Sequence, residues 1–203
     1  MSAGATQTTR LPAAERRRAT VAAALRVFSS TSYAGATTAE IAREAGVSEP
    51  IIYRHFPSKR DLWFACLDEA WSQLREAVEK KVAAMMREPR GLAGVEAAGR
   101  SPWAKPLLPN LWVQGVTEAA EDAEIQRRVR DHMREVHDFI AGLMRRYQEE
   151  GAMPADRDPD AEAWIFVAGG LLRSFADRLG GVLTESDLAA IGRERRRWLS
   201  GSV

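Results

Sequence analysis

The stretch TTAEIAREAGVSEPIIYRHFPSK, residues 37–59, decides the fold that this sequence predicts. Its opening letters TTAE form a capping-box pattern, in which a threonine oxygen and a glutamate side chain satisfy free N–H groups at the start of a helix. Gly46 follows where a left-handed residue would end that helix, and Ser48 can cap the next one. Pro50 falls in the first turn of the second helix, where its missing N–H costs no hydrogen bond. The stretch therefore predicts two short helices joined by a tight turn.

Two features of this helical pair point to DNA. Ala42 and Gly46 are small where the two helices must cross closely, as a helix-turn-helix requires. The second helix has about nine residues and a length of roughly 13 Å, so it fits along a major groove. Its outward residues are Ser48, Glu49, Ile51, Tyr53, Arg54 and His55, and all except the aliphatic Ile51 can form side-chain hydrogen bonds to phosphates or base edges.

The charge of the chain is divided unevenly between its two ends. The formal net charge of all 203 residues is only +1. Residues 1–60 carry nine Lys and Arg against four Asp and Glu, a charge of +5, and the remainder carries −4. The basic part is the part with the helical pair, as expected of a module that binds phosphates.

Residues 16–64 resemble the DNA-binding domain of the tetracycline-repressor (TetR) family of bacterial transcription regulators. The likeness rests on a first helix with Ala24, Leu25 and Phe28, on Tyr33, and on the letters TTAEIAREAGVS and IIYRHFPSK. It implies a three-helix domain whose second and third helices form the helix-turn-helix. It also implies that Thr38, Tyr53, His55 and Lys59 contact phosphates, while residues around 48–54 meet bases. The DNA-binding residues expected on these grounds are Thr38, Ser48, Glu49, Pro50, Ile51, Tyr53, Arg54, His55 and Lys59.

The remainder of the chain predicts helices only, since no strand pattern competes with the helical spacing of its apolar residues. We expect an all-α protein with a disordered arm at 1–11, a helix-turn-helix domain at 12–57 and a larger helical domain at 58–203. The arm is small and polar, which favours disorder. Helices of the larger domain are expected near 58–87, 91–99, 111–120, 121–150, 160–179 and 185–199, with an irregular, proline-bounded segment at 101–109.

Aromatic residues in the interrupted part of the larger domain indicate a cavity wall, because broken helices leave space most easily. Each one taken alone is more often a core residue. His132 and His137 are five residues apart, about 140° on a helix, so they do not suit a two-histidine metal site. We expect both at the surface or its boundary, and we expect no metal or cofactor. The candidate pocket residues are Trp103, Trp112, Val116, Met133, Phe139, Trp164 and Phe175.

The family resemblance also assigns roles to the larger domain. In the family, the C-terminal helical domain binds a small molecule and forms a homodimer through its last two helices, which here are roughly 160–179 and 185–199. The resemblance therefore implies a regulator, most often a repressor, that leaves a palindromic DNA operator when a small ligand binds. The aromatic and methionine residues of the expected pocket favour a hydrophobic ligand of unknown identity.

Two other classes of function stay open. One is a DNA-binding protein that has no effector or that is architectural, which would bind specific and non-specific DNA about equally. The other is a helical enzyme, although the sequence has no Gly-rich phosphate loop, no cluster with metal-ligand spacing and no G-x-S-x-G elbow. We therefore expect no catalytic residues.

Cysteine content and hydropathy indicate the compartment. Cys66 is the single cysteine, so no intrachain disulfide can form, which fits a reducing cytoplasm. The sequence has no apolar run of about 18 residues, and its N-terminus lacks a basic segment followed by an apolar one. We expect a cytoplasmic protein that does not bind a membrane.

Overall fold

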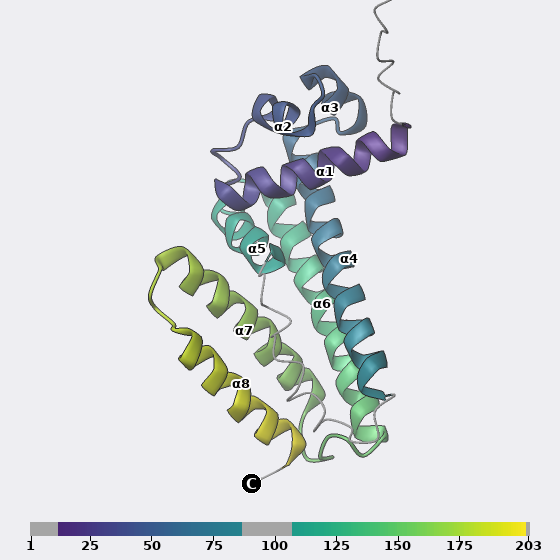
Figure 1. The fold of residues 1–203 in the computed structure, drawn as a ribbon, viewed down its shortest axis with the longest axis vertical. Helices are drawn as coiled ribbons and strands as arrows, with labels where there is room; N and C mark the ends of the chain where they lie inside the picture. The colour runs from purple at the N-terminus through teal and green to yellow at the C-terminus, as the bar shows by residue number, and fades with distance from the viewer. Residues whose placement is uncertain (1–11, 87–106, 202–203) are drawn as a thin grey trace, which may run out of the picture. The chain divides into compact units, whose positions relative to one another are not determined.

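The computed structural model describes residues 12–86 and 107–201, and these residues confirm the all-α fold (Figure 1). The predicted arm at 1–11, the predicted helix near 91–99 and Trp103 lie outside the described residues. Within the described ranges the chain forms eight helices, which are α1 Ala13–Ser30, α2 Thr38–Ala45, α3 Glu49–His55, α4 Lys59–Met86, α5 Leu107–Glu118, α6 Ala123–Glu149, α7 Pro159–Leu179 and α8 Glu185–Ser200.

The chain divides into two compact units, Met1–Cys66 and Leu67–Val203, and the division falls within α4. The first turns of α4 belong to unit 1 because their apolar side chains are buried there. The Trp63 ring meets the Tyr33 ring edge-on, with centroids 5.7 Å apart. The sulfur of Cys66 lies 3.8 Å from the carbonyl oxygen of Val21 in α1. The division is therefore later in the chain than the predicted boundary after residue 57.

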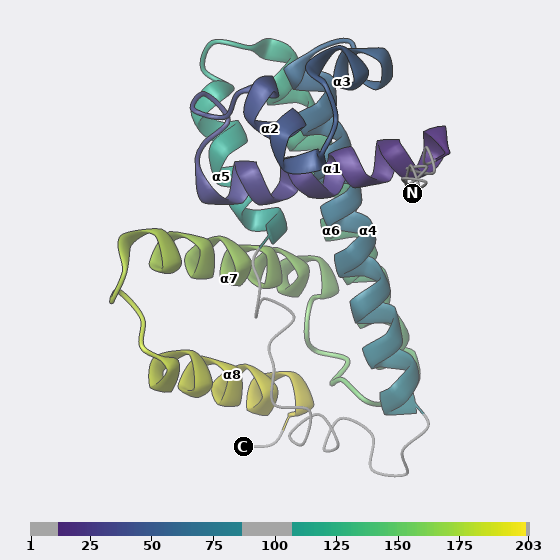
Figure 2. The same ribbon diagram turned by 45° about the horizontal axis from the view of Figure 1, so that its top comes forward.

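Unit 1 is built on α1, which packs against both α2 and α3, and Figure 2 shows α2 and α3 side by side. Each helix turns its apolar stripe inward because water is excluded only on that side. The buried side chains that hold these helices together are Val21, Ala24, Leu25, Phe28, Ile41, Ala42, Ile52 and Phe56.

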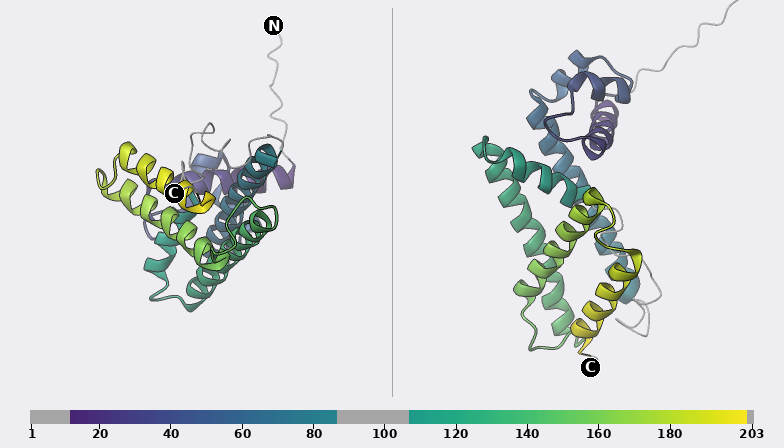
Figure 3. Two further views of the ribbon diagram at one scale, coloured as in Figure 1. Left: turned by 90° about the horizontal axis from the view of Figure 1, so that it is seen from below. Right: turned by 90° about the vertical axis from the view of Figure 1, so that its left-hand side faces the viewer.

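In unit 2, α5 and α7 both pack against the long helix α6, and α5 also touches α7. The second part of α4 joins α6 through Trp71, whose indole N–H donates to the Glu135 carboxylate over 2.8 Å. Helix α8 runs opposite to α7 (Figure 3). One link between them is the buried carboxylate of Glu162, which accepts hydrogen bonds from the Trp198 indole, 2.7 Å away, and from the Arg195 guanidinium.

The beginning of α5 differs from the prediction. The segment 101–109 was expected to be irregular, but α5 begins at Leu107 and includes Pro109. Pro109 lies in the first turn, where a helix has no N–H bond to lose, so the proline ring is accommodated there. Leu108, Leu111 and Trp112 then pack inward and support the helix.

The predicted surface position of the two histidines is wrong, since His132 is 2% and His137 7% exposed. The Trp112 indole N–H donates to Nδ1 of His132 over 3.3 Å, and the ring edges of Trp71 and Trp112 face the imidazole. The aromatic rings exclude water around a group that is more often exposed. Burial lowers the pKa of His132 below its ordinary value of 6.5, together with the nearby charge of Arg128, while Glu135 and Asp68 oppose the shift.

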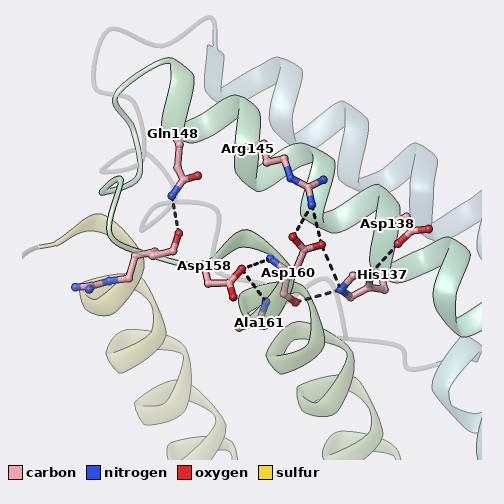
Figure 4. Close-up of polar contacts among 8 residues, drawn as sticks. His137, Asp138, Arg145, Gln148, Asp158, Asp160 and Ala161 are labelled. Carbon is pink, nitrogen blue, oxygen red and sulfur yellow. Dashed lines mark hydrogen bonds and ion pairs between the residues drawn. The ribbon is translucent and has the colours of Figure 1, made fainter.

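His137 lies buried on α6 and contacts the first turn of α7, and Figure 4 shows these polar contacts. Its ring stacks on Trp164 with centroids 4.4 Å apart. Its Nδ1 lies 2.9 Å from the Asp138 carboxylate and its Nε2 lies 3.1 Å from the carbonyl oxygen of Asp160. The carboxylate of Asp160 accepts two hydrogen bonds from Arg145, of 2.6 and 2.7 Å, so the first turn of α7 is fixed on α6.

Replacing His132 by Gln should remove part of the pH dependence of stability. The pKa of His132 is lower in the folded protein than its ordinary value of 6.5. When the pH falls below 6.5, the unfolded chain therefore binds a proton at His132 that the folded chain does not bind. The free energy of unfolding of the wild type should therefore fall more steeply below that pH than that of His132→Gln, by up to about 1.4 kcal/mol per pH unit. Denaturant titrations between pH 5 and 8 measure the difference, and parallel curves would contradict the assignment.

Candidate functional site

The turn between α2 and α3 forms as its sequence dictates. Gly46 has φ 67° and ψ 31°, the left-handed conformation that glycine adopts without a steric penalty. The amide of Val47 donates to the Ala42 carbonyl over 3.0 Å and closes the end of α2. At the other end of α2, the Thr37 hydroxyl accepts from the Glu40 amide over 3.1 Å. A helix-turn-helix with a short second helix is the result.

Helix α3 has one packed side and one open side. Ile52 and the following Phe56 are buried against α1 and α2, whereas Tyr53 is 47% exposed. Ser48 provides the cap position, but no side-chain hydrogen bond from it caps α3 in this unit, which differs from the prediction. Of the remaining residues predicted to contact DNA, Pro50 and Arg54 are exposed, while Glu49, Ile51 and His55 are half-buried.

Thr38 is one of the four residues that the resemblance predicts to contact phosphates, and it is 8% exposed. Its hydroxyl contacts the carboxylate of Glu49 and lies 3.1 Å from the hydroxyl of Tyr53. The first residue of α2 and two residues of α3 thus form one polar cluster.

Lys59 is held by the loop that precedes α2. Its ammonium donates to the carbonyl oxygens of Tyr33 and Ala36, over 2.9 and 3.2 Å, and lies 4.6 Å from the centre of the Tyr33 ring. An ammonium has three N–H groups, so one is left for another acceptor such as a phosphate. The structure gives Lys59 a structural role that its position in the sequence did not indicate.

Unit 2 has a hollow of about 480 Å³. Three of the predicted pocket residues, Val116, Met133 and Trp164, lie in its wall. The other wall residues were not predicted from the sequence, although those on α6 are related to Met133 by three- and four-residue steps, a spacing that could have indicated them. They are Ala119, Ala120, Gln126, Val129, Arg130 and Arg134.

The other predicted pocket residues do not line this hollow. Trp112 is fully buried against His132, and Phe139 packs edge-on against Trp71, with centroids 5.2 Å apart. Phe175 is 50% exposed on α7 and is not among the residues that line the hollow. Trp103 belongs to the part of the chain that is not described. Packing between α4, α5 and α6 therefore uses aromatic residues that composition alone assigned to a cavity.

The described residues form neither a metal-binding cluster nor a helix that could cross a membrane. Among residues 12–86 and 107–201, no group of three or more His, Cys, Asp or Glu side chains could hold a metal ion. In the same part of the chain, every helix is too short or too polar to cross a membrane.

Removing the ammonium of Lys59 should destabilise unit 1. Lys59→Met keeps the apolar stem but loses two charge-assisted hydrogen bonds, so the free energy of unfolding should fall by about 1–3 kcal/mol. Lys80→Met is the matched control, because Lys80 lies on the same helix, is exposed and pairs only with Glu76 in the described structure. Denaturation followed by tryptophan fluorescence compares the two variants, and an equal effect of both would contradict a structural role for Lys59.

Comparison with known proteins identifies the family. Residues 21–66 match the bacterial regulatory proteins of the tetR family. The chain is 32% identical over 187 residues to the HTH-type transcriptional activator FasR of Mycolicibacterium smegmatis, which is 80% of this chain and 85% of that protein.

Two solved structures share the fold. A TetR-family transcriptional regulator from Mesorhizobium loti has a TM-score of 0.72 and 20% identity, and covers 93% of this chain and 95% of its own. A transcriptional regulator from Saccharomonospora viridis in complex with choline has a TM-score of 0.65 and 23% identity, and covers 91% and 96%. With a relative of this identity along most of both chains, the protein belongs to the TetR family of helix-turn-helix transcriptional regulators.

Proposed function

We propose that the protein works in the cytoplasm as a homodimeric repressor, which binds a palindromic operator and leaves it when a small, hydrophobic ligand enters unit 2. The observation that carries this proposal is the apolar surface of α7 and α8. Ile165, Leu172 and Leu179 recur every seven residues along α7 and are 45%, 46% and 71% exposed, with Phe175 between them. A further part of the surface is formed by Ile191 and Trp198 on α8, which are 44% and 49% exposed.

A second copy of the chain is the partner that this surface fits. Exposed apolar side chains in a continuous stripe are costly in water and mark an interface. Helices 160–179 and 185–199 would meet their counterparts across a two-fold axis, so that the same stripe is buried on both subunits. A two-fold dimer presents two copies of α3, which supports an operator made of two inverted half-sites.

The hollow in unit 2 supports a ligand with an apolar body. Its volume of about 480 Å³ suits a small molecule. Val116, Met133 and Trp164 provide apolar walls, while Arg130 and Arg134 are the charged residues among the described lining. Because this lining has no carboxylate, it favours a ligand with a neutral or negatively charged end over a cation such as the choline bound by the Saccharomonospora viridis protein.

Release from DNA requires the ligand to distinguish between two states. One state fits the operator and the other does not. A ligand shifts the population toward the second state only to the extent that it binds this state more tightly than the first. Helix α4 contributes residues to both units, so it is the segment through which we expect ligand binding to change the spacing of the two α3 helices. FasR is named an activator, so a reporter gene behind the operator must show whether this protein lowers or raises transcription.

The dimer can be tested by placing a charge in the apolar stripe. Leu172→Glu should yield monomers in sedimentation experiments, because a buried carboxylate without a partner opposes association. Affinity for a palindromic operator obtained by selection from random duplexes should fall at least about 100-fold, toward the affinity for one half-site. Ser72→Glu adds the same charge to an exposed position of α4 and should change neither result. A dimeric Leu172→Glu protein that still binds the palindrome tightly would refute the proposed interface.

The ligand site can be tested with three probes that share a ten-carbon chain: decanoate, decanol and decyltrimethylammonium. Calorimetry should show that decanoate and decanol bind more tightly than the cation. Arg134→Gln should lower the affinity for decanoate about tenfold and leave the affinity for decanol unchanged. Arg127→Gln removes an exposed arginine of the same helix outside the hollow and serves as control. Tighter binding of the cation, or equal effects of the two arginine variants, would contradict the assignment of this hollow.

A further inference from the structure

Three side chains from the two helices of the helix-turn-helix meet in one place. Thr38 begins α2, Glu49 begins α3, and Tyr53 follows one turn later on α3. The Thr38 hydroxyl donates to the Glu49 carboxylate, and the Tyr53 hydroxyl lies 3.1 Å from the same Thr38 oxygen. Thr38 is 92% buried under this arrangement, whereas Tyr53 remains about half exposed.

The number of protons fixes the direction of both hydrogen bonds. A threonine hydroxyl has one proton, and an ionised carboxylate can only accept. Since the Thr38 proton points at Glu49, the Tyr53 hydroxyl must donate its own proton to the Thr38 oxygen. The Tyr53 proton therefore points at the Thr38 oxygen, and the Thr38 proton points at the negative charge of Glu49.

These two hydroxyls are the groups that the family resemblance assigns to DNA phosphates. A phosphate oxygen is an anionic acceptor like a carboxylate oxygen, and it needs the same protons. Resting on the proposed DNA binding by α3, we propose that Glu49 is a specificity-determining residue. Its carboxylate occupies the place of a phosphate oxygen in the free protein and must be displaced whenever the protein binds DNA.

Displacement has the same cost on every DNA sequence, because every sequence presents the same phosphates. A displaced carboxylate in the major groove can accept a hydrogen bond from the N4 amine of cytosine. Adenine also has an amine there, at N6, but the N7 acceptor beside it repels a carboxylate. Glu49 thus weakens binding to all duplexes and restores it only where a cytosine lies beneath it. Discrimination then comes from a repulsion that one base relieves.

The substitution Glu49→Gln in the full-length protein tests this inference. Affinity for a random-sequence duplex should rise about tenfold at constant salt, because the competing anion is removed. At one operator position the preference should change from cytosine to adenine, since a glutamine amide pairs with adenine N6 and N7. Fluorescence anisotropy with random duplexes and with single-base variants of the selected operator measures both effects.

Two matched variants separate displacement from simple charge repulsion. Glu40→Gln removes one negative charge from α2 without touching the cluster, and it should change the affinity for random duplexes much less. Thr38→Val removes the shared hydroxyl, so Glu49→Gln should add little in that background. Thermal unfolding by circular dichroism checks that all variants fold.

An equal gain from Glu40→Gln, or an undiminished gain from Glu49→Gln beside Thr38→Val, would overturn the role of Glu49 and leave the proposed repressor intact. An unchanged base preference would do the same. If neither the wild type nor any variant bound a duplex, the proposed function would fail together with this inference.

Discussion

The left-handed turn at Gly46 is the constraint on which the DNA-facing side of unit 1 depends. Nothing lies within 4 Å of the position that a Cβ would take at this residue, so glycine is required by backbone conformation and not by lack of space. The turn sets the crossing of α2 and α3, and the buried Ile41 and Ile52 then fix which side of each helix faces inward. The side of α3 opposite Ile52 is left exposed to solvent.

The same crossing brings together residues that are distant in the sequence. Thr38 and Glu49 are eleven positions apart in the sequence. They meet because the first residues of α2 and α3 lie next to each other in space. Lys59 reaches back to Tyr33 and Ala36 for a related reason, since the loop before α2 lies against the first turn of α4. The Thr37 cap of α2, the turn at Gly46 and the inward stripes follow from neighbouring residues and were predicted from the sequence, whereas the predicted side-chain cap by Ser48 does not form. The contacts of Thr38 and Lys59 depend on tertiary packing, so the sequence indicated the residues but not their partners.

Unit 2 illustrates a different limit of sequence-based reasoning. Helical spacing predicted the bounds of α6, α7 and α8 closely. The side chains of Asp122, Asp158 and Thr184 cap the starts of these helices, so local residues fix where each one begins. Composition predicted less well what each aromatic residue does. Trp112 fills the interior and Phe139 packs half-buried against Trp71, whereas Trp164 reaches the hollow and stacks on His137. The burial of His132 could not be predicted either, since its neighbours Trp71 and Trp112 come from two other helices.

The position of Cys66 gives the molecule a reporter of its own motion. This thiol is the only one in the chain, it is fully buried, and it lies at the end of unit 1 against α1. A maleimide can reach it only while the packing around it opens, so the rate of alkylation measures how often that local opening occurs. A change of that rate on adding DNA or a small molecule would register coupling to the opening without any engineered label.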